Sequence, residues 1–225
     1  SRTDQFYESF GVPKERIQRY PFSSIYEREI VSRPPDEQTR TAAKQRLGIH
    51  SARLVLSVGQ TIHRKGYDLL IRAASLLPDG VQVVVVGGKA REEWSELMRE
   101  LHVNNLSFVE FASKETLNDY YTAADVFVLP TREDVWGLVV NEAMAHGVPV
   151  ITTDGCVAGC EMIQEGESGY LIPCETYEPL AGRITQLLEN DPVRECMALA
   201  GLERVRGYTV EAMARAHAER FNQAK

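Results

Sequence analysis

Short β-branched runs alternate with longer helical patterns along this chain, and this alternation restricts its fold more than any other feature. The run Val81–Val86 is almost unbroken in apolar character, which is typical of a strand covered on both faces. Similar runs lie at 54–58, 106–109, 126–129, 148–152 and 170–172, separated by helical patterns at 65–77, 91–102, 115–123 and 137–146. The alternation predicts an α/β, Rossmann-like parallel sheet with right-handed crossovers and helices on both faces.

Both ends of the chain are expected to be helical. A first helix at 3–10 ends at Gly11, and a second begins after the capping residue Asp36 and stops at Gly48. The segment 31–36 contains two prolines and is interpreted as a linker. Three further helices are expected at 177–189, 193–205 and 210–223.

Composition excludes several classes of protein. A chain of 225 residues with a net charge of −7 offers no nucleic-acid surface, and no apolar stretch reaches the ~18 residues that span a bilayer. Four cysteines lack the spacing of a metal site and are expected to be reduced thiols, which favours a cytoplasmic protein. A redox or metal pair at Cys156 and Cys160 is the alternative.

The strongest chemical signal follows the expected strand at 126–129. It reads Asp134-Val-Trp-Gly-Leu-Val-Val-Asn-Glu142. The start of a helix there would offer free amides at Gly137, Leu138 and Val139, which suit an anion, while Glu142 could accept hydrogen bonds from a diol. A phosphate on the amides and a sugar on the carboxylates describe a nucleotide-sugar; the alternative is an ordinary loop-to-helix junction with a favourable acidic residue.

A second signal follows the first strand. Gly59-Gln60 ends that strand, and His63-Arg64-Lys65-Gly66 opens the next helix. Lys65 would then reach the same edge of the sheet as Asp134, where an ammonium suits a phosphate. The alternative is that Arg64 and Lys65 are solvated loop charges.

Other nucleotide and hydrolase templates are missing. The sequence contains no Gly-x-Gly-x-x-Gly, no Walker loop, no Gly-x-Ser-x-Gly and no Asp-x-Asp to hold a divalent metal on a diphosphate. Any phosphate charge must therefore be met by cations or by helix ends.

Together these motifs resemble the C-terminal, donor-binding domain of a GT-B fold, retaining group 1 (family four) glycosyltransferase. The resemblance runs from about Leu54 to Pro173 and includes Glu142-Ala-Met-Ala-His-Gly-Val-Pro-Val-Ile151 and the strand that ends in Gly87-Gly88. It implies a donor-binding domain for metal-independent transfer of a hexose, without a cofactor, in bacterial polysaccharide or glycoconjugate synthesis.

The resemblance also assigns roles to residues. It implies that Glu142 binds the ribose hydroxyls, that Asp134 contacts the donor hexose and that Lys65 neutralises the diphosphate; Asp134 and Lys65 are the catalytic candidates. The remaining donor-binding candidates are Trp136, Gly137, Leu138, Val139, Gly59, Gln60, Arg64, Gly87, Phe111 and Ala112.

Two positions depart from the family pattern. The family's usual residue at the place of Asp134 is Glu, and an Arg usually stands where this chain has Gln60. Loss of a guanidinium partner would cost roughly 1.5–3 kcal/mol of binding to a charged group, and Arg64 is the residue that could compensate.

The resemblance further implies a fragment of a longer enzyme. Residues 1–32 are expected to be the tail of an N-terminal domain with its linker, 33–208 the donor domain, and 209–225 a helix that crosses back. The full-length enzyme is expected to take a UDP- or GDP-linked sugar and a sugar or lipid-linked acceptor, in the cytoplasm or bound peripherally at the cytoplasmic face of the membrane. The isolated chain is expected to be inactive.

Two other functions remain open on the sequence alone. One is a different GT-B reaction, such as a nucleotide-sugar epimerase or a phosphorylase. The other is a non-catalytic nucleotide-binding module of GT-B ancestry, which the departure at Gln60 would suit.

Overall fold

The computed structural model describes residues 2–223, with side chains from 4 to 222. Ser1, the first residue of the expected segment 1–32, lies outside the described residues, as do Ala224 and Lys225 at the end of 209–225. No helix in the described part is both long and apolar enough to pass through a membrane.

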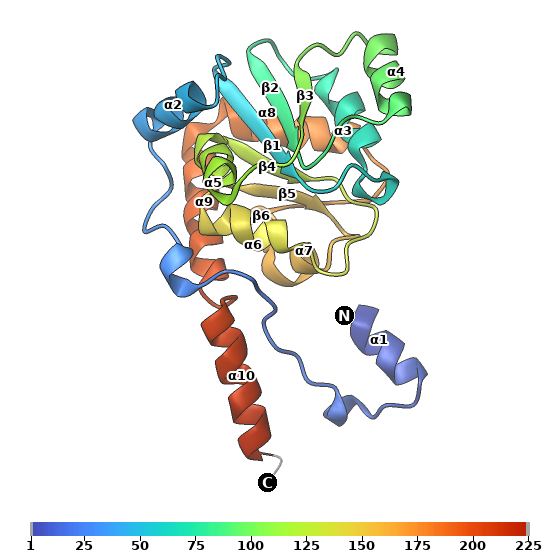
Figure 1. Ribbon diagram of the computed structural model, residues 1–225. Helices are drawn as coiled ribbons and strands as arrows, with labels where there is room; N and C mark the ends of the chain where they lie inside the picture. Colours follow the sequence, from blue (N-terminus) through green and yellow to red (C-terminus); the bar gives the residue numbers. More distant parts are fainter. Residues whose placement is uncertain (1, 224–225) are drawn as a thin grey trace.

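The centre of the molecule is a six-stranded, entirely parallel sheet (Figure 1). Its strands are β1 (Arg53–Val58), β2 (Val81–Val86), β3 (Leu106–Val109), β4 (Val126–Leu129), β5 (Val150–Thr153) and β6 (Gly169–Ile172). The spatial order is β3-β2-β1-β4-β5-β6. The expected fold class is confirmed, and β5 begins two residues later than predicted.

Alternate residues of each strand enter different cores, because successive side chains point to opposite faces. Leu54 and Leu56 of β1 belong to one buried cluster, and Val55 between them belongs to the other. The first cluster lies under α2 (Glu37–Arg46), α5 (Lys114–Ala123), α6 (Leu138–Ala145) and α7 (Val157–Met162). The second lies under α3 (Tyr67–Ala74), α4 (Glu92–Glu100) and α8 (Glu178–Glu189), while α9 (Asp191–Val205) reaches both.

Helix ends follow the capping residues in the sequence. Asp36 accepts a hydrogen bond from the Thr39 amide at 2.8 Å, as predicted, and α2 ends next to Gly48. Asn190 caps α9 by accepting from the Val193 amide at 3.2 Å, so that helix begins two residues before the predicted start. The expected helix at 65–77 is divided into a 3₁₀ turn, His63–Lys65, and α3.

The order of the strands reverses at β1. β1 pairs with β2 on one side and with β4 on the other, so the loops that follow β1 and β4 leave the sheet side by side. In open parallel sheets this is the place where ligands bind. The sequence motif from Gly59 to Gly66 lies in the loop after β1, and the motif from Asp134 to Glu142 covers the end of the loop after β4 and the first residues of the helix Leu138–Ala145.

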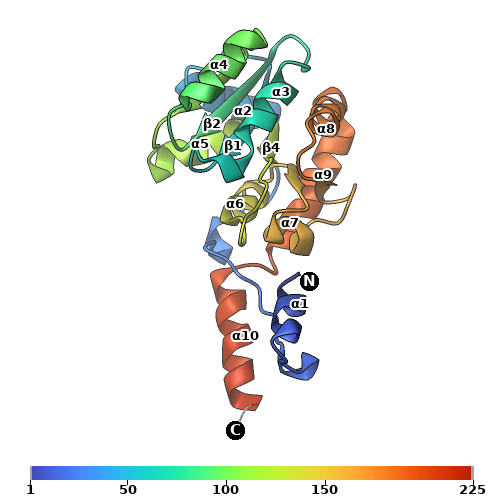
Figure 2. The same cartoon turned by 90° about the vertical axis from the view of Figure 1, so that its right-hand side faces the viewer.

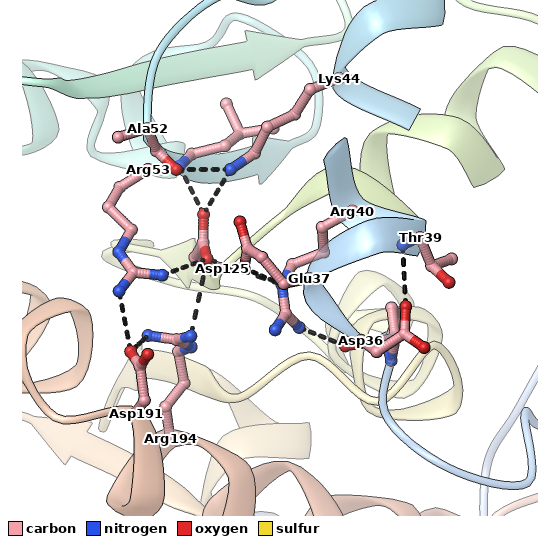
Figure 3. A network of polar contacts seen from close by, with 12 residues as sticks. Asp36, Glu37, Thr39, Arg40, Lys44, Ala52, Arg53, Asp125, Asp191 and Arg194 are labelled. Atoms are coloured by element: carbon pink, nitrogen blue, oxygen red, sulfur yellow. Dashed lines mark hydrogen bonds and ion pairs between the residues drawn. The ribbon is translucent and has the colours of Figure 1, made fainter. Parts of the chain in front are cut away.

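The opposite edge of the sheet holds a buried ion network around Asp125, just before β4 (Figure 3). The Asp125 carboxylate accepts from Lys44 at 3.0 Å and Arg53 at 3.3 Å, and Arg40 and Arg194 lie 3.8 and 3.9 Å away. It also accepts from the Leu54 amide at 2.8 Å. One carboxylate thus joins α2, β1 and α9, which the sequence analysis did not predict.

Two helices stand away from the sheet: α1 (Arg2–Ser9) and α10 (Val210–Gln223) (Figures 1 and 2). The chain between α1 and α2 runs back to the body past the start of α10. There the Val210 amide donates to the Ile25 carbonyl at 2.8 Å, and the Glu27 amide donates to the Glu211 carboxylate at 3.0 Å. We call segments 19–27 and 208–217 together the strut.

Candidate functional site

Lys65 and Asp134 meet at the carboxyl edge of the sheet. The Lys65 ammonium donates to the Asp134 carboxylate in a close ion pair, and the two residues are 8% and 9% exposed. Arg64 adds a second positive charge 3.9 Å from the same carboxylate. The sequence predicted that these groups share an edge of the sheet, and the structure shows that they contact each other directly.

A left-handed glycine places Lys65 in this position. Gly66 ends the 3₁₀ turn at φ 69°, and a Cβ there would lie 2.0 Å from the Pro130 carbonyl oxygen. The Arg64 carbonyl accepts from the Arg132 amide at 2.7 Å and from the Thr131 hydroxyl at 2.9 Å. The loops after β1 and β4 are therefore held together by backbone contacts as well as by charge.

The start of α6 lies next to this ion pair in the chain. Its first turn bond runs from the Val140 amide to the Gly137 carbonyl at 2.8 Å, so the amides of Gly137, Leu138 and Val139 precede any helical bond and have no acceptor in the described part of the chain. Gly137 has φ 100°, and a Cβ there would lie 2.6 Å from Cys156 Sγ. The protein's own packing thus requires this glycine, apart from any ligand.

Glu142 lies one turn further along α6 and is largely buried. The Tyr121 hydroxyl donates to its carboxylate at 2.7 Å, and the Tyr121 ring stacks on His146 with centroids 4.9 Å apart. Burial raises the pKa of Glu142, and the bond from Tyr121 opposes that rise. The structure thus places this carboxylate beside Tyr121, in a partly buried position.

The side chain of Trp136 is turned toward the strut. Its ring meets Phe22 edge-on, with centroids 5.7 Å apart, and lies 6.1 Å from Tyr208. Its indole N–H donates to Asn141 Oδ1 at 2.9 Å. The one polar atom of the Trp136 side chain is therefore already used by the protein.

The remaining donor-binding candidates lie in the loops after β1, β2 and β3 and differ in their burial. Gly59 and Gly87 lie back to back, since a Cβ on Gly87 would lie 2.4 Å from the Gly59 carbonyl oxygen. Gln60 is exposed beside them. Phe111 is 95% exposed, whereas Ala112 packs against the buried cluster under α5.

Three contributors to this region had not been predicted. Tyr121 holds Glu142, Asn141 joins Trp136 to the Phe22 carbonyl at 3.3 Å, and Cys156 Sγ donates to the Trp136 carbonyl at 3.2 Å. No sequence signal distinguishes these side chains from ordinary core residues. Cys156 is buried and Cys160 exposed, and neither forms a disulfide with another cysteine of the described residues. The described residues contain no group of three or more His, Cys, Asp or Glu side chains placed to hold a metal.

The family model described as "Glycosyl transferases group 1" matches residues 39–204, which is most of the chain. This chain belongs to the group 1 glycosyltransferase family. The family resemblance inferred from the sequence is thereby confirmed. The loops after β1 and β4 therefore lie at the carboxyl edge of the sheet in a glycosyltransferase domain.

Curated relatives of this glycosyltransferase domain agree with the family. It is 32% identical over 196 residues to D-inositol 3-phosphate glycosyltransferase of Corynebacterium diphtheriae, covering 80% of this chain and 45% of that protein. It is 31% identical over 163 residues to mannosylfructose-phosphate synthase of Agrobacterium fabrum, covering 67% of this chain and 35% of that protein. The chain thus spans less than half the length of these relatives.

Several solved structures have the same fold. Sucrose-phosphate synthase from Thermosynechococcus elongatus matches all of this chain and 57% of its own, with a TM-score of 0.82 at 27% identity. HepE of Anabaena, solved with UDP, matches 98% of this chain and 61% of its own with a TM-score of 0.84 at 19% identity. The C-terminal domain of LpcC from Francisella tularensis matches 79% of this chain and 96% of its own, with a TM-score of 0.70 at 24% identity. The last two matches show the fold alone.

Proposed function

We propose that this domain binds a nucleoside-diphosphate hexose for retaining, metal-independent transfer to an acceptor. The observation that carries the proposal is the contact of Lys65 with Asp134 beside the free amides of Gly137 to Val139. A nearly buried cation, a carboxylate and three helix-start donors at one point suit a ligand with adjoining anionic and hydroxylated parts.

The diphosphate would compete with Asp134 for Lys65. Separating the ion pair without a replacement would strand two poorly hydrated charges, which is unfavourable. A diphosphate supplies that replacement for Lys65 and also accepts from the amides of α6. Asp134, released from its partner, would then accept hydrogen bonds from hexose hydroxyls.

Glu142 would take the ribose. Its carboxylate keeps acceptor capacity beyond the single bond from Tyr121, because an ionised carboxylate has two oxygens and about four lone-pair sites. A vicinal diol would add charge-assisted hydrogen bonds, which favour the ionised carboxylate. Binding would therefore lower a pKa that burial raises in the free domain.

Thermal shift and calorimetry with UDP, GDP and their hexose conjugates test this proposal. A ligand that binds only the folded state raises the unfolding midpoint in proportion to the logarithm of its concentration. UDP and UDP-glucose come first, because HepE of Anabaena was solved with both. Glu142→Gln is the site variant, and Glu195→Gln, an exposed acid on α9, is the matched control. If no nucleoside diphosphate binds the parent chain in millimolar range, the proposal is wrong.

Transfer itself would need more than this domain. We propose that residues 33–208 bind the donor and that a sugar or lipid-linked acceptor is held by a second, N-terminal domain, with 1–32 and 209–225 connecting the two. The support is that the chain spans 35–45% of curated relatives such as those above. Synthesis of a bacterial polysaccharide or glycoconjugate in the cytoplasm, or at the cytoplasmic face of the membrane, is part of the same proposal.

A nucleotide-binding module without catalysis is the second candidate. The observation that favours it is Gln60, an exposed neutral side chain at the edge of the sheet where the family usually has Arg. Arg64 is turned to Asp134 and to the Glu133 carbonyl, 2.9 Å away, so that one nitrogen of its guanidinium is already used within the protein. Gln60→Arg separates the candidates: a gain in diphosphate affinity without sugar transfer by the full-length enzyme would favour the module.

A further inference from the structure

Trp136 lies where three parts of the molecule meet. Its backbone belongs to the loop between Asp134 and Gly137, while its side chain contacts Phe22 and Tyr208, one from each segment of the strut. Asn141 completes the connection, accepting from the indole N–H at 2.9 Å and donating to the Phe22 carbonyl at 3.3 Å. The strut therefore contacts the loop through an aromatic cluster and a two-bond bridge.

The strut is a connected unit. Besides the two backbone contacts already described, Arg215 pairs with Glu27 at 3.0 Å and Tyr20 packs on His217 with ring centroids 4.4 Å apart. The two segments are about 190 residues apart in the chain but are joined by these hydrogen bonds, this ion pair and this ring contact. A shift of one segment is therefore expected to move the other, and Trp136 touches both.

The other side of the loop is fixed to the sheet domain. The Trp136 carbonyl accepts from the Ala158 amide at 2.7 Å and from the Cys156 thiol at 3.2 Å, and the Asp134 amide donates to the Gly155 carbonyl at 2.9 Å. The loop is thus held to the sheet domain on one side, and on the other side the Trp136 indole contacts the strut. A displacement of the indole is therefore expected to change the backbone of the few residues around it, among them Asp134 and Gly137.

We propose that Trp136 is a positioning residue, which couples the position of the strut to the ligand-binding geometry of the loop from Asp134 to Val139. The proposal rests on the proposed function, namely that this loop binds a nucleoside diphosphate. Coupling between two sites is reciprocal in free energy. Changes in the strut should therefore alter affinity, and nucleotide binding should alter the strut.

The first arm of the test measures affinity for UDP and GDP by calorimetry. Phe22→Ala removes the edge-on contact with Trp136 from a partly exposed position, and Phe22→Leu retains apolar bulk. We expect Phe22→Ala to weaken binding roughly two- to thirtyfold and Phe22→Leu to weaken it less, because changes along a coupling network have effects of that size. Phe221→Ala, at an exposed position on α10, is the matched control and should bind as the parent does.

The second arm measures amide hydrogen exchange at Val210, whose N–H donates to Ile25 within the strut. Nucleotide should slow this exchange in the parent, and Trp136→Leu should abolish the slowing at saturating nucleotide. A merely structural tryptophan would change stability without linking nucleotide to Val210.

The outcomes are distinct. Lack of binding by the parent chain overturns the proposed function and, with it, this inference. Binding by the parent, with unchanged affinity in Phe22→Ala and unchanged exchange at Val210, overturns the role of Trp136 alone.

Discussion

The Tyr121 hydroxyl donates a 2.7 Å hydrogen bond to the Glu142 carboxylate, and Tyr121 is buried whereas Glu142 remains partly exposed. Burial raises the pKa of Glu142, and burial, followed by the nearby Glu142 charge, raises the pKa of Tyr121. The carboxylate that we propose as the ribose ligand thus lies in surroundings that disfavour its charge.

Stability should depend on pH through Glu142. A carboxyl whose pKa is higher in the folded state contributes stability that is complete below the unfolded pKa and is lost as pH rises through the folded pKa. We expect Glu142→Gln to remove this loss. The unfolding temperature of the variant should therefore rise relative to that of the parent as the pH is raised from 4 to 8. Parallel midpoints across that range would contradict the prediction. Glu195→Gln, exposed on α9, is the control.

The same substitution should weaken nucleotide binding. If Glu142 accepts from both ribose hydroxyls, Glu142→Gln should cost roughly 1.5–3 kcal/mol of affinity for a nucleoside diphosphate. Calorimetry at pH 7.5 on both proteins measures the difference. Equal affinities would remove Glu142 from the site while leaving the pH prediction intact.

Breaking the pair between Lys65 and Asp134 should destabilise the free domain. Either Lys65→Met or Asp134→Asn leaves one nearly buried group without its partner, which we expect to lower the free energy of unfolding by about 3 kcal/mol. Denaturant titration of both single variants and the double variant measures this. The double variant should lose less than the sum of the singles; strict additivity would show that the contact contributes nothing.

The domain should prefer a diphosphate to a monophosphate without divalent metal. Lys65 and the amides at the start of α6 provide positive potential at one place, and the second phosphate adds charge there. Binding of UDP, UMP, GDP and GMP in the presence of EDTA measures the preference. A strict requirement for magnesium or manganese would contradict it.

Neutralising the buried Asp125 should destabilise the protein more than neutralising an acid in an exposed ion pair. Asp125→Asn leaves Lys44 and Arg194, both about 5% exposed, without their common carboxylate, and we expect a loss of about 3–5 kcal/mol. Asp119→Asn, which removes an exposed pair with Arg46, is the control and should cost at most about 1 kcal/mol. Similar losses in the two variants, measured by urea unfolding, would show that burial of the network is unimportant.

The sequence predicted the sheet well because β-branched runs such as Val81–Val86 must be covered on both faces. It also predicted that Lys65 and Asp134 share an edge, since both follow the carboxyl ends of strands. It missed α7, because six residues that include Gly159 give no helical periodicity. It missed the burial of Glu142, because the residue that covers it, Tyr121, comes from α5 and is brought there only by packing.

The network around Asp125 could not be predicted for the same reason. Its cations come from α2, β1 and α9, and nothing in the spacing of Lys44 and Arg194 along the chain brings them to one carboxylate. Local pattern determines helices and strands, whereas contacts between distant segments depend on the order in which strands pair.

The pairing of β1 with β4 determines when, during folding, the proposed nucleotide site is formed. Lys65 and Asp134 lie 69 residues apart, and β2, β3 and three helices are formed by the chain between β1 and β4. Closing so long a loop is slow compared with the formation of helices and neighbouring strands. During refolding, the helical signal should therefore return before the capacity to bind nucleotide does. The binding of a fluorescent nucleotide, followed during refolding, would measure the rate at which β1 pairs with β4 and joins the two halves of the sheet.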